Sequence, residues 1–160
     1  MGAQTTIGVL EFTKSTFARA EEAQDQIRAT GVASFDYLWT IFEPGQIIYE
    51  KRRVTDNSWL YEQFLKVKNL EFEYSELNKA VGISLLVEKI VHQQAPQAGT
   101  YLVTSQRQIR YFTDLKPLTS ETIGFTPLDM IQEPERGILR AKFIDLGRRY
   151  LHLSSQPFTV

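Results

Sequence analysis

The sequence predicts an α+β fold in which N-terminal helices precede a central sheet and a C-terminal helix follows it. The sheet is expected to be mostly antiparallel or a partly open barrel. Three observations support this: apolar residues recur every three or four positions near both ends, they alternate with polar residues in the middle, and turn-forming residues separate these regions. The 160 residues fit one domain, residues 1–160, because a chain of this length buries a single core.

The first predicted element is an amphipathic helix over residues 9–30. Gly31 follows it, at the position where many helices end on a residue with positive φ, which glycine adopts without steric cost. Charged residues separate the apolar positions, which share one face of the helix: Val9, Phe12, Phe17, Ala20, Ala23 and Ile27.

A second, short helix is predicted over residues 35–42, the segment densest in aromatic residues. Ser34 precedes it as a candidate N-cap, and the Asp36 carboxylate would meet the positive end of the helix dipole. Aromatic residues dominate interface hot spots, so Trp39 and Phe42 are candidates for a partner surface. Their helical spacing beside a sheet favours a place in the core instead.

After the turn predicted at Pro44-Gly45, the apolar period falls to two, which is the spacing of β-strands. We predict strands over Gln46–Val54, Trp59–Tyr74, Ile83–His92, Tyr101–Ser105 and Gln108–Phe112, with loops at Asp56-Asn57-Ser58 and Gln93–Thr100. Residues 113–130 are expected to be irregular and to wrap an edge of the sheet. Pro117 and Pro127 indicate this, because neither has the backbone N–H that a central strand donates.

Pro134 is expected to open a last helix with a basic outer side formed by Arg136, Arg140, Lys142, Arg148 and Arg149. The helix dipole alone favours such charge near a helix C-terminus, so these residues do not by themselves indicate an anionic partner. The apolar residues of this helix are spaced for packing, and a core role is predicted for Phe143 and Tyr150. They follow one another at intervals of four, three and four: Leu139, Phe143, Leu146 and Tyr150.

Composition and motifs argue against most catalytic classes. The chain has no cysteine for a thiolate nucleophile or a typical zinc site, and no glycine precedes a lysine as a phosphate-binding loop requires. His92 and His152 have no further metal ligands near them in the sequence. We therefore predict that the chain is not an enzyme, and that it has no catalytic, cofactor-binding or metal-binding residues and no cofactor.

Charge and hydropathy limit location and partners. The 18 Lys and Arg against 19 Asp and Glu give a net charge of −1, so no overall field attracts nucleic acid. No apolar run reaches the length of a membrane span, and the first ten residues lack the pattern of an export signal. We expect an intracellular protein, cytoplasmic or nuclear.

The run Lys51-Arg52-Arg53 is the strongest local candidate for binding an anion. In a strand, however, neighbouring side chains point to opposite faces, so the three charges would not converge. A solvated edge that resists pairing with other strands is the favoured interpretation.

The segment from residue 35 to 49 resembles the signature L-W-x-x-F-x-P-G-x-x-x-Y of an uncharacterised domain that precedes the ATPase module in fungal AAA-type proteins. Here Leu38, Trp39, Phe42, Pro44, Gly45 and Tyr49 carry the signature. The similarity covers about residues 5–153 and includes residues 111–118, Pro127 and the last helix, where Leu146-Gly147 replaces the Arg-Gly pair of the family.

The resemblance implies a non-catalytic N-terminal domain, as a fragment or short paralogue, that recognises a protein partner or packs against the ATPase module of its own family. Hydrolysis of ATP would then belong to that module. Two alternatives stay open. One is a small ligand-binding or enzymatic barrel whose site is scattered over the sheet, since such sites leave no local spacing pattern. The other is a weak nucleic-acid-binding module that uses Lys51–Arg53 and the last helix.

Overall fold

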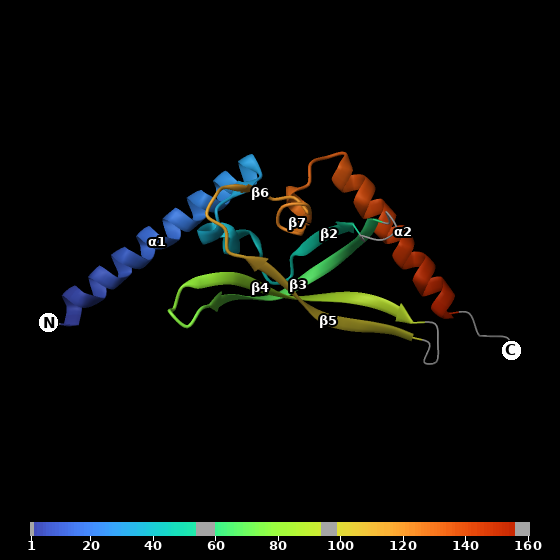
Figure 1. Cartoon of the computed structure of the whole chain (residues 1–160), viewed down its shortest axis with the longest axis horizontal. Coiled ribbons are helices and arrows are strands. Elements are labelled where there is room, and N and C mark those ends of the chain that lie inside the picture. The colour runs from blue at the N-terminus through green and yellow to red at the C-terminus, as the bar shows by residue number, and fades with distance from the viewer. Residues whose placement is uncertain (1, 54–59, 94–98, 156–160) are drawn as a thin grey trace.

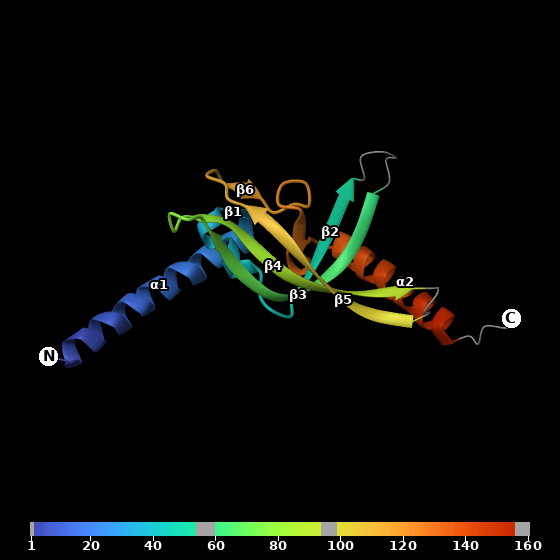
Figure 2. The ribbon, with the colours of Figure 1, turned by 60° about the horizontal axis from the view of Figure 1, so that its bottom comes forward.

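The computed structural model describes residues 2–53, 60–93 and 99–155, and it confirms the predicted α+β class (Figure 1). Two long helices lie toward opposite ends of a twisted sheet: α1 (Gly2–Thr30) projects away from it, whereas α2 (Glu135–Ser155) runs alongside the strands β2 (Ile47–Arg53) and β3 (Leu60–Tyr74). A second view shows the same arrangement, with the outer ends of α1 and α2 far apart (Figure 2). Among the described residues, no helix has the length and apolar character needed to cross a membrane.

The main sheet has the strand order β5-β4-β3-β2-β7, and every neighbouring pair in it is antiparallel. It does not close on itself, so β5 and β7 are its two edges. The predicted loop at Asp56–Ser58 and most of the loop at Gln93–Thr100 lie outside the described residues. The strands are β2 (Ile47–Arg53), β3 (Leu60–Tyr74), β4 (Ala80–Gln93), β5 (Gly99–Arg110) and β7 (Phe125–Pro127).

The prediction of separate strands over Tyr101–Ser105 and Gln108–Phe112 is wrong. One strand, β5, covers the first segment, continues through the break and ends at Arg110, and it pairs with β4 along its whole length. The polar residues between them suggested a break, but the Arg107 side chain has a partner inside the sheet. Its guanidinium group contacts the Glu50 carboxylate, so this charge does not end the strand.

The segment at 113–130 wraps an edge of the sheet, as predicted, but it is not wholly irregular. Within it, β7 pairs with β2, while β6 (Lys116–Pro117) pairs with β1 (Val32–Ala33) in a second, small sheet. A single turn of 3-10 helix, η2 (Leu128–Met130), follows β7. Pro117 and Pro127 both lie in short strands at sheet edges, where a missing backbone N–H breaks no central pairing.

The hydrophobic core lies on one face of the main sheet, here called the inner face, which carries Ile48, Leu65 and Val87. The helix after β1 and the segment after β5 cover this face. Phe42 meets Phe125 edge to face at 5.7 Å between ring centroids, and Phe35 meets Phe112 in the same way at 5.6 Å. The core therefore joins residues far apart in the sequence.

The predicted short helix exists as a 3-10 helix, η1 (Phe35–Ile41). With three residues per turn, Phe35, Leu38 and Ile41 align and are buried. Trp39 turns outward and is 38% exposed, so its predicted place in the core is wrong, whereas Phe42 is buried as predicted. The Ser34 hydroxyl makes no capping hydrogen bond, contrary to expectation.

The first helix, α1 (Gly2–Thr30), ends where predicted. Gly31 has φ +69° and donates its N–H to the Ile27 carbonyl at 2.8 Å. Near this end Ala20 and Ile27 are buried, whereas Val9 and Phe12 are 60% and 73% exposed. The apolar face predicted for this helix thus packs only in its C-terminal part, and the N-terminal half extends beyond the sheet (Figures 1 and 2).

The last helix, α2 (Glu135–Ser155), begins directly after Pro134, as predicted. It packs on the outer face of the hairpin formed by β2 and β3. Phe143 stacks on Phe64 with 4.0 Å between ring centroids, and Lys142 forms an ion pair with Glu62. Phe143 is half-buried and packs on the outer face of the sheet, so its predicted place in the core is wrong. The side chain of Tyr150 lies outside the described residues.

We expect Gly31→Ala to lower the free energy of unfolding by about 1 kcal/mol, because alanine is strained at positive φ. Urea denaturation followed by circular dichroism measures this change. Gly8→Ala is the matched control, since Gly8 lies inside α1 and a new Cβ there meets no atom within 4 Å. An equal loss of stability in both variants would contradict the proposed role of Gly31.

Candidate functional site

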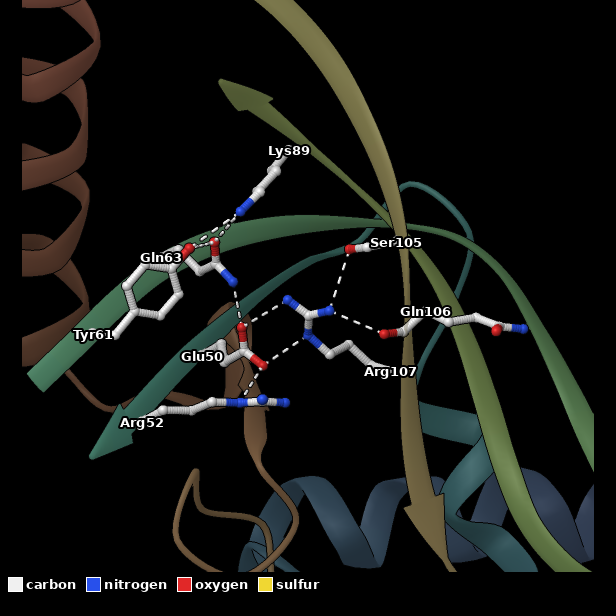
Figure 3. Close-up of polar contacts among 8 residues, drawn as sticks. All are labelled: Glu50, Arg52, Tyr61, Gln63, Lys89, Ser105, Gln106 and Arg107. Carbon is white, nitrogen blue, oxygen red and sulfur yellow. Dashed lines mark hydrogen bonds and ion pairs between the residues drawn. The ribbon is translucent and has the colours of Figure 1, made fainter. Parts of the chain in front are cut away.

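Polar side chains continue the inner face of the sheet beyond the apolar core. Strand alternation causes this, because Glu50 lies two residues after Ile48 and Gln63 lies two residues before Leu65. Glu50 and Gln63 also face each other in the register of β2 and β3. Figure 3 shows these groups together with residues of β4 and β5, and we call the set Glu50, Arg52, Tyr61, Gln63, Lys89, Ser105 and Arg107 the inner polar cluster.

The Glu50 carboxylate is the centre of this cluster and is fully buried. Arg107 contacts it with two nitrogens: Nε donates to Oε1 at 2.8 Å and Nη2 donates to Oε2 at 3.2 Å. Arg52 Nε lies 2.9 Å from Oε1, and the Gln63 amide donates to Oε2. Both carboxylate oxygens are therefore fully engaged.

The contact between Glu50 and Arg107 spans four of the five strands of the main sheet. Glu50 lies on β2 and Arg107 on β5, with β3 and β4 between them in the strand order. In a flat sheet, three strand spacings of about 4.8 Å would separate the two backbones. A direct two-point contact between these side chains requires the sheet to curl toward its inner face, which gives the open sheet a partly barrel-like shape.

Further hydrogen bonds extend the cluster at both sides. Arg107 Nη1 donates to Ser105 Oγ at 3.2 Å and to the Gln106 carbonyl at 3.0 Å. Lys89 Nζ donates to Tyr61 Oη at 3.2 Å and to Gln63 Oε1 at 3.4 Å. The cluster thus links four strands through polar contacts alone.

The environment of Glu50 determines its ionisation. Burial by itself raises the pKa of Glu50, but the hydrogen bonds from Arg107 and Gln63 and the charges of Arg107 and Arg52 outweigh it and lower the pKa below its ordinary value. Glu50 is consequently ionised at neutral pH. Its oxygens already accept several hydrogen bonds and are buried, so this carboxylate is not placed to act as a general base on a ligand.

A second feature is an open pocket of about 370 Å³ where α1, η1 and β3 meet. Its walls are mainly apolar and include Phe17, Trp39 and Phe42. Two carboxylates, Glu21 and Glu43, belong to its rim. The pocket is braced by the Gln24 amide, which donates to the Thr40 carbonyl and, at 3.1 Å, to Glu43.

The structure separates the members of the predicted basic run. Lys51 and Arg52 lie past the last β2 residue that pairs with β7 and are exposed, as the solvated-edge interpretation expects. Arg52, however, joins the buried Glu50, whereas Lys51 lies on the outer face, where its charge acts on Glu62. The side chain of Arg53 lies outside the described residues.

Other residues singled out in the sequence do not converge on a site. On the predicted basic side of α2, Arg136 pairs with Glu133 and Arg149 pairs with Asp145. The side chains of His92 and His152 lie outside the described residues. Within the described ranges, no group of three or more acidic residues or histidines is arranged to hold a metal ion.

Sequence reasoning missed most of the inner polar cluster. The sequence did contain a pattern that indicates these residues. Glu50 and Arg107 each lie two positions from an apolar residue, Ile48 and Ile109, so the alternation of a strand places all four side chains on the inner face. A charge at such a position needs a partner of opposite sign. The pairing itself could not be read from the sequence, because the two residues are on non-adjacent strands.

Comparison with known proteins gives one match. A protein-family model described as a domain of unknown function, DUF7025, matches residues 23–130. The matched range contains the strands of both sheets, η1, η2 and the packed end of α1, whereas α2 and the projecting part of α1 lie outside it. Neither a search of curated proteins nor a search of solved structures gave a match.

We expect Glu50→Gln to lower the free energy of unfolding by about 3 kcal/mol at neutral pH, because it leaves the half-buried Arg107 charge without its partner. The pKa of Glu50 is lowered on folding, so its stabilising effect is present above about pH 4.5 and is lost as the pH falls through the folded-state pKa. The difference between wild type and variant, measured by urea denaturation, should therefore shrink in acid.

The control for this experiment is Asp145→Asn, which removes a carboxylate from an exposed ion pair with Arg149 on α2. Exposed pairs contribute little, so we expect a change below about 0.5 kcal/mol. A Glu50→Gln effect as small as that of the control, or one that does not depend on pH, would rule out the structural role assigned to Glu50.

Proposed function

We propose that this chain, which belongs to the DUF7025 family of domains of unknown function, is a non-catalytic protein-interaction domain. The observation that carries the proposal is the apolar stripe of α1. Its C-terminal part, including Ala20 and Ile27, is buried against the body of the domain. Its N-terminal part, including Val9 and Phe12, continues along the same face and is exposed.

The exposed part of this stripe favours a protein partner on physical grounds. A helix of about 15 residues without packing is marginally stable in water, so the projecting half of α1 gains most from a surface that covers it. Burying a Val or Phe side chain contributes roughly 1.5–3 kcal/mol each. A partner that covers Val9 and Phe12 thus stabilises both the complex and the helix.

The pocket beside η1 extends this surface. Phe17 is 61% exposed and belongs to the pocket wall together with Trp39, which is also exposed. Aromatic side chains of this kind contribute most of the binding energy at many interfaces. The carboxylates of Glu21 and Glu43 at the rim favour a partner that brings an apolar side chain flanked by a basic one.

The resemblance to the fungal AAA-type signature supports a finer proposal. Three residues of the signature, Trp39, Phe42 and Pro44, belong to the wall of this pocket. We propose that the chain is the N-terminal domain of such a protein. The surface formed by α1 and the pocket would then receive a client protein or the ATPase module of its own family.

The test is photo-crosslinking in the cells from which the protein comes, with the photoreactive amino acid p-benzoylphenylalanine at position 17 of the chain. We expect a discrete crosslinked species that contains a second, different protein. Phe17→Ser should abolish co-purification of that protein, and it should change the free energy of unfolding by less than about 0.5 kcal/mol, because the side chain is exposed.

The matched control places the same photoreactive residue at position 22, where Glu22 is exposed on another side of α1. The same products from positions 17 and 22 would contradict the proposal. Crosslinks only between two copies of the chain would also overturn it, because they would show self-association.

A second expectation follows from assigning ATP hydrolysis to another module. The purified chain, incubated with ATP and Mg²⁺, should release no phosphate above the level of a buffer blank in a continuous phosphate assay. Turnover that copurifies with the chain and disappears in a variant of one of its own residues would refute its assignment as non-catalytic.

A further inference from the structure

We propose that the inner polar cluster is an oxyanion-binding site, in which Arg52 and Arg107 bind a carboxylate or phosphate group and Lys89 adds its charge. This site is separate from the surface of α1 and does not depend on the proposed protein interaction. It is built by β2, β3, β4 and β5, so no single stretch of the sequence contains it.

The argument begins with the charge balance of the cluster. The cluster contains three cations, Arg52, Lys89 and Arg107, and one carboxylate, Glu50, which contacts the two arginines. The whole chain carries a net charge of −1, so this local excess of positive charge does not reflect composition. A second anion would neutralise it.

The two guanidinium groups are held side by side. Arg52 Nε and Arg107 Nε both contact Oε1 of Glu50, at 2.9 Å and 2.8 Å. Two like charges at such close range repel each other, and Glu50 neutralises only one of them. An oxyanion that bridges the pair removes the remaining repulsion, and guanidinium groups match the geometry of carboxylate and phosphate oxygens.

The cluster is oriented so that an anion meets cations first. The Glu50 side chain is fully buried, whereas the Arg52 side chain is 57% exposed. Within the described residues, the terminal nitrogens of Arg52 have no hydrogen-bond partner, because its contact with Glu50 uses Nε. The buried carboxylate lies between the two arginines and fixes their direction (Figure 3). The exposed terminal nitrogens of Arg52 remain available to an anion.

The position of Lys89 adds to the site without competing for Glu50. Its Nζ atom bonds to Tyr61 and to Gln63, and Gln63 in turn donates to Glu50. Tyr61 Oη donates to Gln63 Oε1, so the lysine is held by neutral groups. The full positive charge of Lys89 therefore contributes to the electrostatic potential at the inner face.

The experiment is a titration of the ¹⁵N-labelled chain with sodium phosphate and, in a separate arm, with sodium acetate, both at constant ionic strength. The arginine Nε–Hε signals report directly on the two groups that contact Glu50. We expect saturable shifts of these signals. Saturation with phosphate alone identifies a phosphate site, and saturation with acetate at similar concentrations identifies a general oxyanion site.

Arg52→Gln and Lys51→Gln form the matched pair of variants, since both remove one positive charge from the same run but on opposite faces of β2. We expect Arg52→Gln to weaken binding at least about tenfold and Lys51→Gln to change it less than about twofold. Arg52 is largely exposed, so its replacement should preserve the fold, which the amide spectrum verifies. No saturable shift with either anion, or equal weakening by both variants, would overturn the proposal.

Discussion

The ion pair between Glu50 and Arg107 is the constraint on which the shape of this domain depends. It joins β2 to β5 across two intervening strands and so fixes how far the sheet curls. Breaking a buried pair by removing one partner is costly, even when the pair itself adds little net stability, because the remaining charge stays unpaired. The pair therefore specifies the curvature of the sheet and limits which substitutions it tolerates.

The predictable part of the fold was the part that depends on local periodicity. The long leading helix, its end at Gly31 and the last helix after Pro134 follow from spacing and from glycine and proline chemistry alone. Spacing did not predict the type of helix at η1, because apolar residues three or four positions apart fit both an α-helix and a 3-10 helix. Only the packing of Phe35, Leu38 and Ile41 against the sheet decides between them, and that decision turned Trp39 outward.

The part that could not be predicted depends on pairs of residues that are distant in the sequence. Local spacing places Glu50 and Arg107 inward but does not say which strands become neighbours, so it cannot assign them to each other. Periodicity likewise does not predict that α1 divides into a packed part and a projecting part. The apolar stripe is continuous, and only the extent of the sheet determines where its burial stops.

The two faces of β2 show why this arrangement is stable against a slip in register. On the inner face Glu50 is neutralised by Arg52 and Arg107. On the outer face Tyr49 is buried against Phe64, where burial and the neighbouring Glu62 raise the pKa of Tyr49. A slip of one residue would exchange these faces. Glu50 would then meet the acidic Glu62, and Tyr49 would leave Arg107 unpaired. The charges of the inner polar cluster therefore also exclude the competing strand pairing.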